Sequence, residues 1–514
     1  MIHDYRKLAA LGVAFYLAGC TIPSSQAATI PAPRIESEVR VPRLFSDNMV
    51  LQAGTNAAIW GWADDGALVW VIFRNEVVSV RAQNGKWLVH LHNLEPGGPY
   101  NLTITSANTL QFTNVMVGEV WVAGGQSNME FPLRDSFLGA GDIASAGNPM
   151  IRFLKVPHTR LDVPTNDIRG NWTEAAPATV ANNSAVAYYF ARDLQAKLRV
   201  PIGIIESDWG GTPAEVWMDY DFLHGNAHWE GEIIKDWVVQ ESRYHERLKA
   251  FDNEKRRAQE NNTEFTNRPP GRPWKPAELY NGMIAPLIPY AIKGVIWYQG
   301  EGNAGSLERA QQYHSLFPGL IRDWRSLWGE GDFPFLLVQL APFMDIQNQP
   351  GPSAWASLRE AQLESTKILP NVGMAVITDV GMEHNIHPTK KMPVGERLAM
   401  AAYAIAYHQP IEGSGPAYRG MRVEGSHIVV TFDHVGGGLV ARNGDLTGFA
   451  IAGPDEKFYW AGAQIESSDK VIVFSPAVQN PVAVRFGWAN YPVVNLWNKA
   501  GLPASPFRTD VFAK

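Results

Sequence analysis

Ser127 stands in the stretch "GGQSNME" (residues 124–130), directly after the apolar run "VWVA". Gly124 and Gly125 permit a sharp backbone turn, and a serine on such a turn at the end of a buried strand is open to a substrate. A Gly-Gly-x-Ser turn by itself is more often structural. Ser127 is therefore a candidate nucleophile that needs partners elsewhere in the chain.

Three further polar motifs follow apolar runs. "SDWGGTPAEVWM" carries Gly210 and Gly211 before an expected helix start, where backbone N–H groups can donate to a developing oxyanion. "WYQGEGNA" carries Asn303, whose side-chain amide could donate to the same oxyanion, and "GMEHNIHPTKK" carries His387 in a loop before a helix expected near Pro393. Each motif alone is commonly structural, but together they supply a nucleophile, two kinds of donor and a base, which acyl transfer needs.

Five short apolar runs must position these groups: "EVWVAGG", "IGIIESDWGG", "GVIWYQGEG", "FLLVQLAP" and "GMAVITDVG". Helical patterns such as "SAVAYYFARDLQAKL" and "RAQQYHSLFPGLIRDWRSLW" lie between them. Buried strands alternating with helices predict an α/β domain over residues 116–410, with a mostly parallel five-stranded sheet in a flavodoxin-like three-layer fold. Ligands of such folds gather at the carboxyl ends of the strands, where the motifs fall.

Both flanks of this domain have β-texture. Residues 38–115 predict an N-terminal β-sandwich, because apolar alternation and turn residues dominate there. Residues 411–514 predict a C-terminal, jelly-roll-like β-sandwich segment, which is either a domain of its own or the other half of the first sandwich. The charged stretch 228–262 predicts a long exposed helix to which we assign no chemistry.

The first 29 residues have the pattern of an export signal. Arg6 and Lys7 precede an apolar stretch, Leu8 to Ala18, that is too short to span a bilayer. "LAGC" resembles the lipobox of bacterial lipoproteins, in which Cys20 becomes lipidated; the alternative is a soluble secreted protein cut near Ala27. Either way we expect export to the periplasm or outer membrane, with a possible lipid anchor at Cys20 as the only membrane contact.

Composition narrows the remaining classes. A length of 514 residues implies two or three domains. The formal net charge of −7 gives no reason to expect nucleic acid as a partner. Cys20 is the only cysteine, so the folded part has no thiol nucleophile, disulfide or cysteine-based metal site.

These four motifs resemble those of carbohydrate O-acetylesterases of the SGNH-hydrolase superfamily. Within that superfamily, the pattern is most similar to that of sialate O-acetylesterases and related polysaccharide acetylesterases. "GGQSNME", "WGGTPAEVW", "WYQGEGNA" and "IHPTKK" match the Ser, Gly, Asn and His blocks of that superfamily. The likeness continues outside the α/β domain, in "LFSDNMVLQ", "YNGMIAPL" and "VRFGWANYPVVNLWNKAGLPASPFRTD". It therefore covers nearly all of the chain after the export signal.

The resemblance implies a role for each matched position. Ser127 would be the nucleophile and His387 the general base. The Ser127 and Gly211 backbone N–H groups and the Asn303 side chain would line the oxyanion hole, with Gly210 as the alternative if the register differs by one residue.

Two positions depart from the family pattern. Gly302 replaces a serine that is common in the Asn block. The family commonly has aspartate three residues before the catalytic histidine, and this chain has His384 there. The acid that orients the histidine is therefore open: Asp379 is the first choice, Glu383 the second, and a Ser–His dyad without a carboxylate the third.

The expected function is hydrolysis of O-acetyl esters on carbohydrate, with no metal or organic cofactor. The acetylated glycan is not indicated by the residues: sialic acids, plant hemicelluloses such as xyloglucan or xylan, and peptidoglycan all carry acetyl groups. A non-catalytic surface protein that binds glycans is the alternative, since a fold does not guarantee activity. Nothing in the sequence indicates the oligomeric state.

Overall fold

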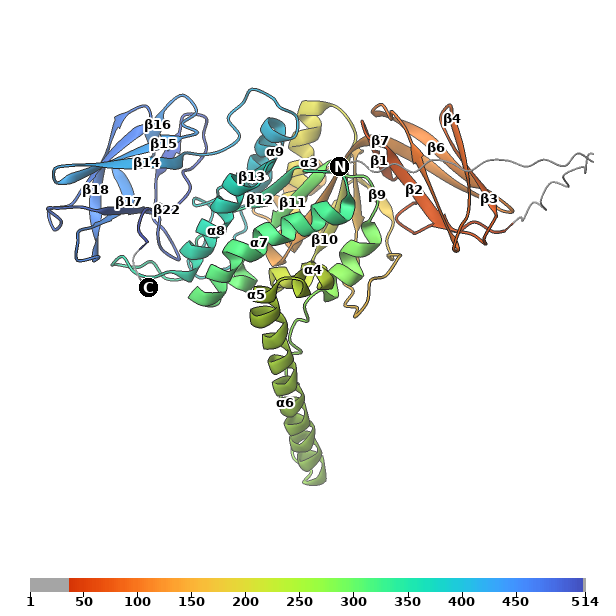
Figure 1. Ribbon diagram of the computed structural model, residues 1–514, viewed down its shortest axis with the longest axis horizontal. Helices are drawn as coiled ribbons and strands as arrows, with labels where there is room; N and C mark the ends of the chain where they lie inside the picture. Colours follow the sequence, from red (N-terminus) through yellow and green to blue (C-terminus); the bar gives the residue numbers. More distant parts are fainter. Residues whose placement is uncertain (1–36, 512–514) are drawn as a thin grey trace, which may run out of the picture.

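The computed structural model describes residues 37–511, so the predicted export signal and Cys20 lie outside the described residues. An N-terminal β-domain, a central α/β domain and a C-terminal β-domain follow one another along the long axis of the molecule (Figure 1). No helix among the described residues is both long and apolar enough to cross a membrane.

The N-terminal β-domain is built on alternating burial. Trp87, Val89 and Leu91 of one strand point into its core while the residues between them are exposed. Its strands are β1 (Val50–Gln52), β2 (Ala57–Trp62), β3 (Leu68–Phe73), β4 (Glu76–Arg81), β5 (Lys86–Leu91), β6 (Gly97–Thr105) and the first half of β7 (Thr109–Gly125). Strands β2 and β5 form one small sheet, and the others pair through β3, β6 and β7.

Strand β7 belongs to two domains. Its residues 109–118 pair with β6 and β1, and residues 119–125 pair with the central sheet. The expected domain boundary between residues 115 and 116 therefore falls inside a continuous strand. A strand shared by two sheets fixes the N-terminal domain against the central one without a linker.

The central sheet has the strand order β13-β12-β11-β7-β10-β8-β9. The five predicted runs form the adjacent parallel strands β13 (Val372–Ala375), β12 (Phe335–Val338), β11 (Gly294–Tyr298), β7 and β10 (Ile202–Asp208). Parallel β8 (Asn148–Lys155) and antiparallel β9 (Trp172–Ala175) extend the sheet beyond the expected five strands. Numbered along the chain, the five predicted strands have the spatial order 2-1-3-4-5 of the flavodoxin fold, and β8 lies outside β10 as an additional strand. The pattern hid β8 because Pro149 and the buried Arg152 interrupt its apolar run.

Helices cover both faces of this sheet, which makes three layers (Figure 1). Alternate residues of β7 show the division: Val120 and Val122 pack on the side of α7 (Leu307–Trp328) and α8 (Ala354–Ile368). Trp121 and Ala123 pack on the side of α3 (Ala185–Leu198) and α9 (Met392–Ile405). Short elements complete the domain: α1 (Ser127–Glu130), η1 (Leu133–Asp135), α2 (Gly139–Ala144), η2 (Val180–Asn182), η3 (Ala214–Trp217), η5 (Tyr280–Ile284), η6 (Ala285–Leu287) and η7 (Glu301–Asn303).

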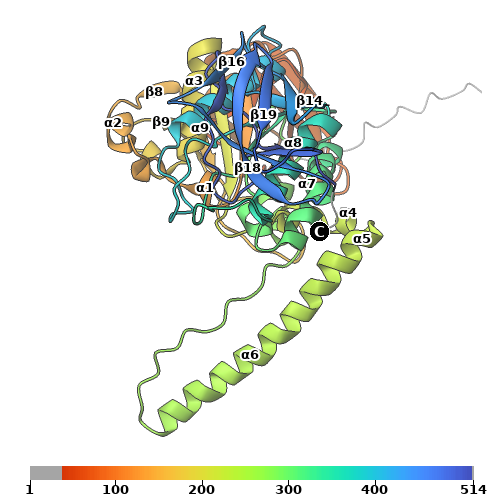
Figure 2. The ribbon, with the colours of Figure 1, turned by 90° about the vertical axis from the view of Figure 1, so that its left-hand side faces the viewer.

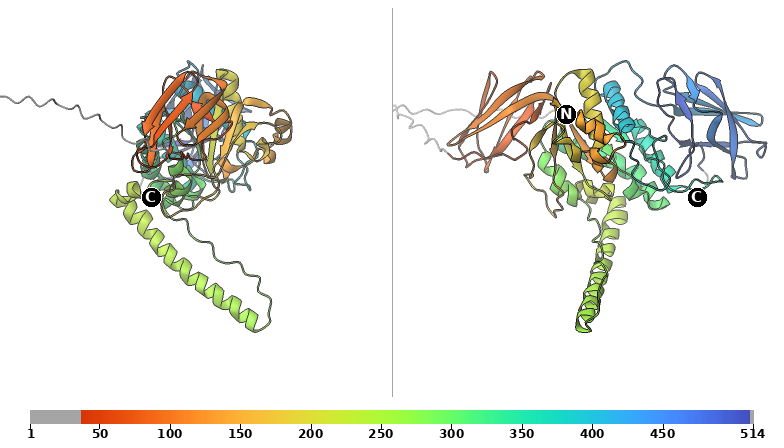
Figure 3. Two further views of the ribbon diagram at one scale, coloured as in Figure 1. Left: turned by 90° about the vertical axis from the view of Figure 1, so that its right-hand side faces the viewer. Right: turned by 180° about the vertical axis from the view of Figure 1, so that it is seen from behind.

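Helix α6 (Lys235–Glu260) projects far from the body of the protein, and the chain returns alongside it (Figures 2 and 3). The helix has no buried residue, which confirms the predicted long exposed helix. Contacts with the returning segment include the rings of Phe251 and Phe265, whose centroids lie 5.3 Å apart. Elements α4 (Tyr220–His224), α5 (Ala227–Trp229) and η4 (Glu230–Ile234) join it to the α/β domain.

The C-terminal strands pair only with one another among the described residues, and they enclose a core of their own. This segment is thus a separate antiparallel β-domain, not the other half of the N-terminal sandwich. Its strands are β14 (Ala417–Glu424), β15 (His427–Asp433), β16 (Leu439–Ala441), β17 (Leu446–Ala452), β18 (Phe458–Ser467), β19 (Lys470–Phe474), β20 (Ala483–Phe486), β21 (Leu496–Asn498) and β22 (Phe507–Arg508).

Arg359 of α8 joins the α/β domain to this C-terminal β-domain. The side chain is fully buried and donates to the carbonyls of Leu340 and Ala341 at 2.7 and 3.0 Å. It also donates to the carbonyls of Ala489 and Asn490 across the domain interface, at 2.8 and 2.9 Å. One guanidinium therefore satisfies four backbone acceptors from two domains.

Replacing Arg359 with methionine should lower the free energy of unfolding by about 3 kcal/mol, because several buried carbonyls lose their donor. Urea denaturation followed by tryptophan fluorescence measures the change. Arg322→Met on the exposed side of α7 is the matched control and should change stability by less than about 0.5 kcal/mol. Equal stability of the two variants would show that Arg359 does not hold the domains together.

Candidate active site

Three loops meet because the strands that carry them end at the same level. Gly125 of β7 pairs with Asp208 of β10 on one side and with Tyr298 of β11 on the other. Ser127, Gly211 and Asn303 each follow one of these three residues by two to five positions. Gly125 has a φ of 137°, and any side chain there would collide with the carbonyl of Tyr298. The glycine is thus required for the turn that leads into Ser127.

Ser127 and His387 are in direct contact. The Nε2 atom of His387 lies 2.8 Å from the Oγ atom of Ser127, although the two residues are 260 positions apart in the chain. Ser127 is the first residue of α1, so its backbone N–H has no acceptor within the helix. His387 lies between β13 and α9, and both side chains line a cavity of about 400 Å³.

The loop that carries His387 is held by Asn128. The Asn128 amide nitrogen donates to the carbonyl of Ile386 at 2.9 Å and to Oε1 of Glu301 at 2.6 Å. The backbone N–H of His387 donates to Oδ1 of Asn385 at 2.9 Å. Asn128, next to Ser127, thereby fixes Ile386, next to His387. This tether helps to set the distance between the Ser127 hydroxyl and the His387 imidazole.

A buried ionic group lies behind this contact. The ammonium of Lys391 donates to Oδ1 of Asn128 and lies over the rings of Phe131 and Tyr298, at 4.7 and 5.4 Å from their centroids. Burial lowers the pKa of Lys391 to about 7, although the negative charge of Glu301 acts in the other direction and raises this pKa. Burial likewise raises the pKa of Glu301. Removal from water disfavours both charges, which therefore depend on each other and on Asn128.

The pKa of His387 is lowered from its ordinary value. Partial burial is the larger cause, and the positive charge of Lys391 is the second. Both effects disfavour the imidazolium form. A neutral imidazole can accept a proton from the hydroxyl of Ser127, which is what a general base must do.

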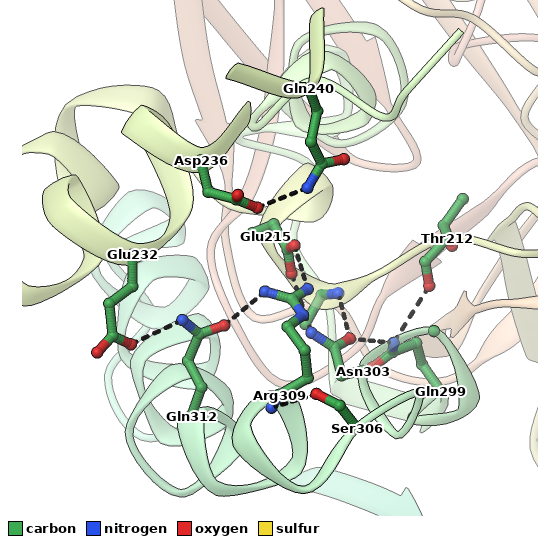
Figure 4. A network of polar contacts seen from close by, with 12 residues as sticks. Thr212, Glu215, Glu232, Asp236, Gln240, Gln299, Asn303, Ser306, Arg309 and Gln312 are labelled. Atoms are coloured by element: carbon green, nitrogen blue, oxygen red, sulfur yellow. Dashed lines mark hydrogen bonds and ion pairs between the residues drawn. The ribbon is translucent and has the colours of Figure 1, made fainter. Parts of the chain in front are cut away.

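Asn303 makes hydrogen bonds to buried groups of the Gly and Asn motifs. The side chain is fully buried beneath the Gly motif, and its Oδ1 accepts from the N–H of Ala214 at 2.8 Å and from Nε2 of Gln299 at 2.7 Å. Its Nδ2 donates to Glu215, which in turn pairs with Arg309 (Figure 4). Asn303 therefore holds two loops together, and the oxyanion role that the sequence suggested for its amide stays a prediction.

The two glycines of the Gly motif have different surroundings. A side chain on Gly210 would place its Cβ atom 3.2 Å from the Cβ atom of Ser127, so the loop passes directly over the serine. The N–H of Gly210 donates to Oε2 of Glu130 at 2.7 Å. Gly211 has a φ of 73° and is exposed. Of the two, Gly211 is the residue whose N–H is open to a ligand.

Asp379 does not contact His387. Its two carboxylate oxygens lie 2.6 and 2.8 Å from the guanidinium of Arg397, in a two-point ion pair. Glu383 accepts the N–H of Ile346 at 3.0 Å, and the His384 side chain is 77% exposed. Within residues 37–511 no carboxylate lies within 4.0 Å of a His387 ring nitrogen. Asp379, the first choice for the orienting acid, is thus paired with Arg397. The sequence could not indicate this pairing, because the two residues meet only in the folded chain.

The cavity at Ser127 is rich in charge. Glu130, Arg134, Asp135 and Lys155 line it, two of each sign. Lys155 lies 3.8 Å from the buried carboxylate of Glu206. Polar and charged groups of this kind suit a ligand that carries many hydroxyls.

A second group of side chains beside the serine could hold a cation. Glu130, His158 and Asp208 each offer one atom within 4.8 Å of the others. The Nε2 atom of His158 already lies 3.0 Å from the carbonyl of Asp208 and 3.3 Å from Glu130. These contacts occupy the imidazole within the protein, and we assign the group no catalytic part.

Sequence reasoning missed Asn128, Glu301 and Lys391. All three lie within the quoted motifs, but the functional roles were assigned to Ser127, Asn303 and His387 of the same motifs. Their shared burial exists only after three loops have met, so only their position inside the motifs could have marked them.

Comparisons with known proteins agree with this geometry. A family model of carbohydrate esterases, described as sialic acid-specific acetylesterases, matches residues 271–404. The human sialate O-acetylesterase is 28% identical over 91% of this chain and 92% of its own length, and the rat protein is 29% identical over 90% and 93%.

A solved structure is more similar still. The crystal structure of a carbohydrate acetylesterase from Xanthomonas citri has 39% sequence identity and a TM-score of 0.80. The match covers 92% of this chain and all of the other. Identity at this level over the whole length, with the serine and histidine in contact, shows that the chain belongs to the SGNH-type carbohydrate acetylesterases and is a carboxylic ester hydrolase.

Proposed function

We propose that this protein removes O-acetyl groups from carbohydrate by a serine mechanism in which Ser127 is the nucleophile and His387 the general base. The observation that carries the proposal is the 2.8 Å contact between the Ser127 hydroxyl and the His387 imidazole. It is the arrangement that an acyl-transfer nucleophile and its base require. The names of the similar acetylesterases support carbohydrate as the substrate class.

The reaction has two steps. In the first, His387 takes the proton of Ser127 Oγ as this oxygen attacks the acetyl carbonyl. The C–O bond to the sugar then breaks, and the imidazolium gives its proton to the departing sugar oxygen. In the second step, His387 takes a proton from water, whose oxygen attacks the acetyl-enzyme. The C–O bond to Ser127 then breaks, the imidazolium returns the proton to Ser127 Oγ, and acetate and the free serine are formed.

The negative charge of each tetrahedral intermediate needs donors. We assign this role to the backbone N–H groups of Ser127 and Gly211, because the first opens α1 and the second is exposed beside it. Asn303 acts one step further away, by holding the Gly motif through Ala214.

We also propose that His387 works without an orienting carboxylate. Asn128 takes the place of that acid by tethering the carbonyl of Ile386, and the Asn385 side chain fixes the backbone of His387. The buried Lys391 keeps Asn128 in position.

Export, with a lipid anchor at Cys20, is the proposed location, and it rests on the N-terminal residues alone.

Ser127→Ala should reduce the turnover of p-nitrophenyl acetate at least about 10⁴-fold, because the acyl-enzyme cannot form. The fold should persist, since the hydroxyl makes no hydrogen bond in the described residues beyond that with His387. Release of p-nitrophenol measures the rate, and circular dichroism checks the fold. Near-native turnover would remove Ser127 from the mechanism.

When kcat/KM is plotted against pH, the midpoint of its rise on the acid side should lie below pH 6.5. The base must be neutral, a histidine is neutral above its pKa, and burial together with Lys391 lowers this pKa. The value of kcat/KM should therefore rise with pH through the lowered pKa and be level by about pH 7. A limb above pH 7 would contradict a neutral, partly buried His387.

Asp379→Asn and Glu383→Gln should each keep their turnover rate within about tenfold of wild type, whereas removal of a true orienting acid can slow turnover about 10⁴-fold. Asp379→Asn should lower the melting temperature, because Arg397 loses its ion-pair partner. Kinetics with p-nitrophenyl acetate and thermal melting separate the two effects. If either variant turned over its substrate about a thousandfold more slowly than wild type, that carboxylate would be the orienting acid of a Ser–His–acid triad.

A further inference from the structure

A second cavity lies between the α/β domain and the C-terminal β-domain, and it has no part in the chemistry at Ser127. Its volume is about 390 Å³. One wall is residues 346–348, in the loop between β12 and α8. The opposite wall comes from residues 446–449, 460–461, 487–489 and 491–493 of the C-terminal β-domain, around β17 and β18 (Figure 1). We call this cavity the interdomain cleft.

Apolar side chains are exposed in the interdomain cleft. Trp460 is 39% exposed, and its indole N–H donates to the carbonyl of Asn348 at 2.9 Å, which fixes the edge of the ring. Ile346 and Val493 are 45% and 53% exposed. Exposed apolar groups gathered in one cleft commonly mark a binding site. A fixed indole can receive the apolar face of a sugar ring at little further entropic cost.

The polar groups of the interdomain cleft are neutral. None of the residues that line it carries a charge, in contrast to the four charged residues in the cavity at Ser127. The Oε1 atom of Gln347 is buried and has no hydrogen-bond partner among the described residues. A buried acceptor without a donor is unfavourable, and rotation of the Gln347 amide toward the cleft would let a sugar hydroxyl supply the missing hydrogen bond.

The interdomain cleft is joined to the loop that carries His387. The N–H of Ile346 donates to Glu383 at 3.0 Å, and the hydroxyl of Tyr491 donates to the carbonyl of Gly381 at 3.4 Å. Both acceptors precede His387 by only a few residues. A ligand in the cleft therefore contacts two loops that are hydrogen-bonded to the segment leading to His387.

From these observations we infer that the interdomain cleft binds a neutral stretch of polysaccharide while another sugar of the same chain offers its acetyl group to Ser127. The inference rests on the proposed function and narrows it: the substrate is a neutral polymeric glycan. A single acetylated sialic acid would leave the cleft unused, and its carboxylate would find no cation there. Aromatic stacking and amide groups, without charge, fit a hemicellulose-like chain.

Isothermal titration with unacetylated soluble xyloglucan, xylan and sialyllactose tests the cleft directly, because binding needs no acetyl group. The full chain should bind at least one neutral polysaccharide more tightly than sialyllactose. Trp460→Ala should weaken that binding at least about tenfold, since truncation of a tryptophan at the centre of a binding site commonly costs more than about 1.4 kcal/mol. Its kcat/KM for p-nitrophenyl acetate should stay within about twofold of wild type.

Two further variants guard the result. Tyr220→Ala removes an exposed aromatic ring on α4, outside the cleft, and should leave polysaccharide binding unchanged. Gln347→Leu keeps Trp460 in place and should also weaken binding, so the inference stays testable if Trp460→Ala melts at a lower temperature. Loss of ester turnover in the wild type would overturn the proposed function. If ester turnover is intact, three results would overturn the inference about the interdomain cleft alone. They are that no neutral polysaccharide binds, that sialyllactose binds more tightly than the neutral polysaccharides, or that both cleft variants bind polysaccharide like wild type.

Discussion

The hydrogen bond between Ser127 and His387 is the contact that the strands and loops of the α/β domain together position. It joins residues 260 positions apart, so neither local loop can set its 2.8 Å length. The level ends of β7, β10 and β11 bring the loops together, and Asn128 then fixes the carbonyl of Ile386 next to the histidine. A displacement of about one ångström at any of these points would cost the proton transfer its geometry.

The same region is electrostatically unfavourable in isolation. Glu301 and Lys391 lose hydration on burial, and each needs the other and Asn128 to remain charged. The Lys391 charge in turn helps to lower the pKa of His387, and the neutral imidazole is the form that the proposed base must have. A group that costs stability thus prepares the site for its reaction, as is common where pKa values are shifted in functional sites.

The two β-domains are attached in different ways. The N-terminal domain shares the continuous strand β7 with the central sheet, so its position follows from backbone hydrogen bonding. The C-terminal domain is held by side chains, above all by Arg359, and this leaves room for a cleft at the interface. A chemical site and a neutral cleft on shared loops would let one protein both hold a chain and cleave esters from it.

The sequence by itself indicated Ser127 and His387 as partners and predicted the five strands that carry their loops, because glycine turns, apolar runs and helical periodicity are local properties. It could not identify β8, whose buried Arg152 breaks the apolar run, nor the true partners of Asp379 and Asn303. Those partners are chosen by distance in the folded chain. Only the tertiary structure decided that an arginine binds the expected acid and that the expected oxyanion amide is buried, since competition between polar groups is resolved only after the strands have packed.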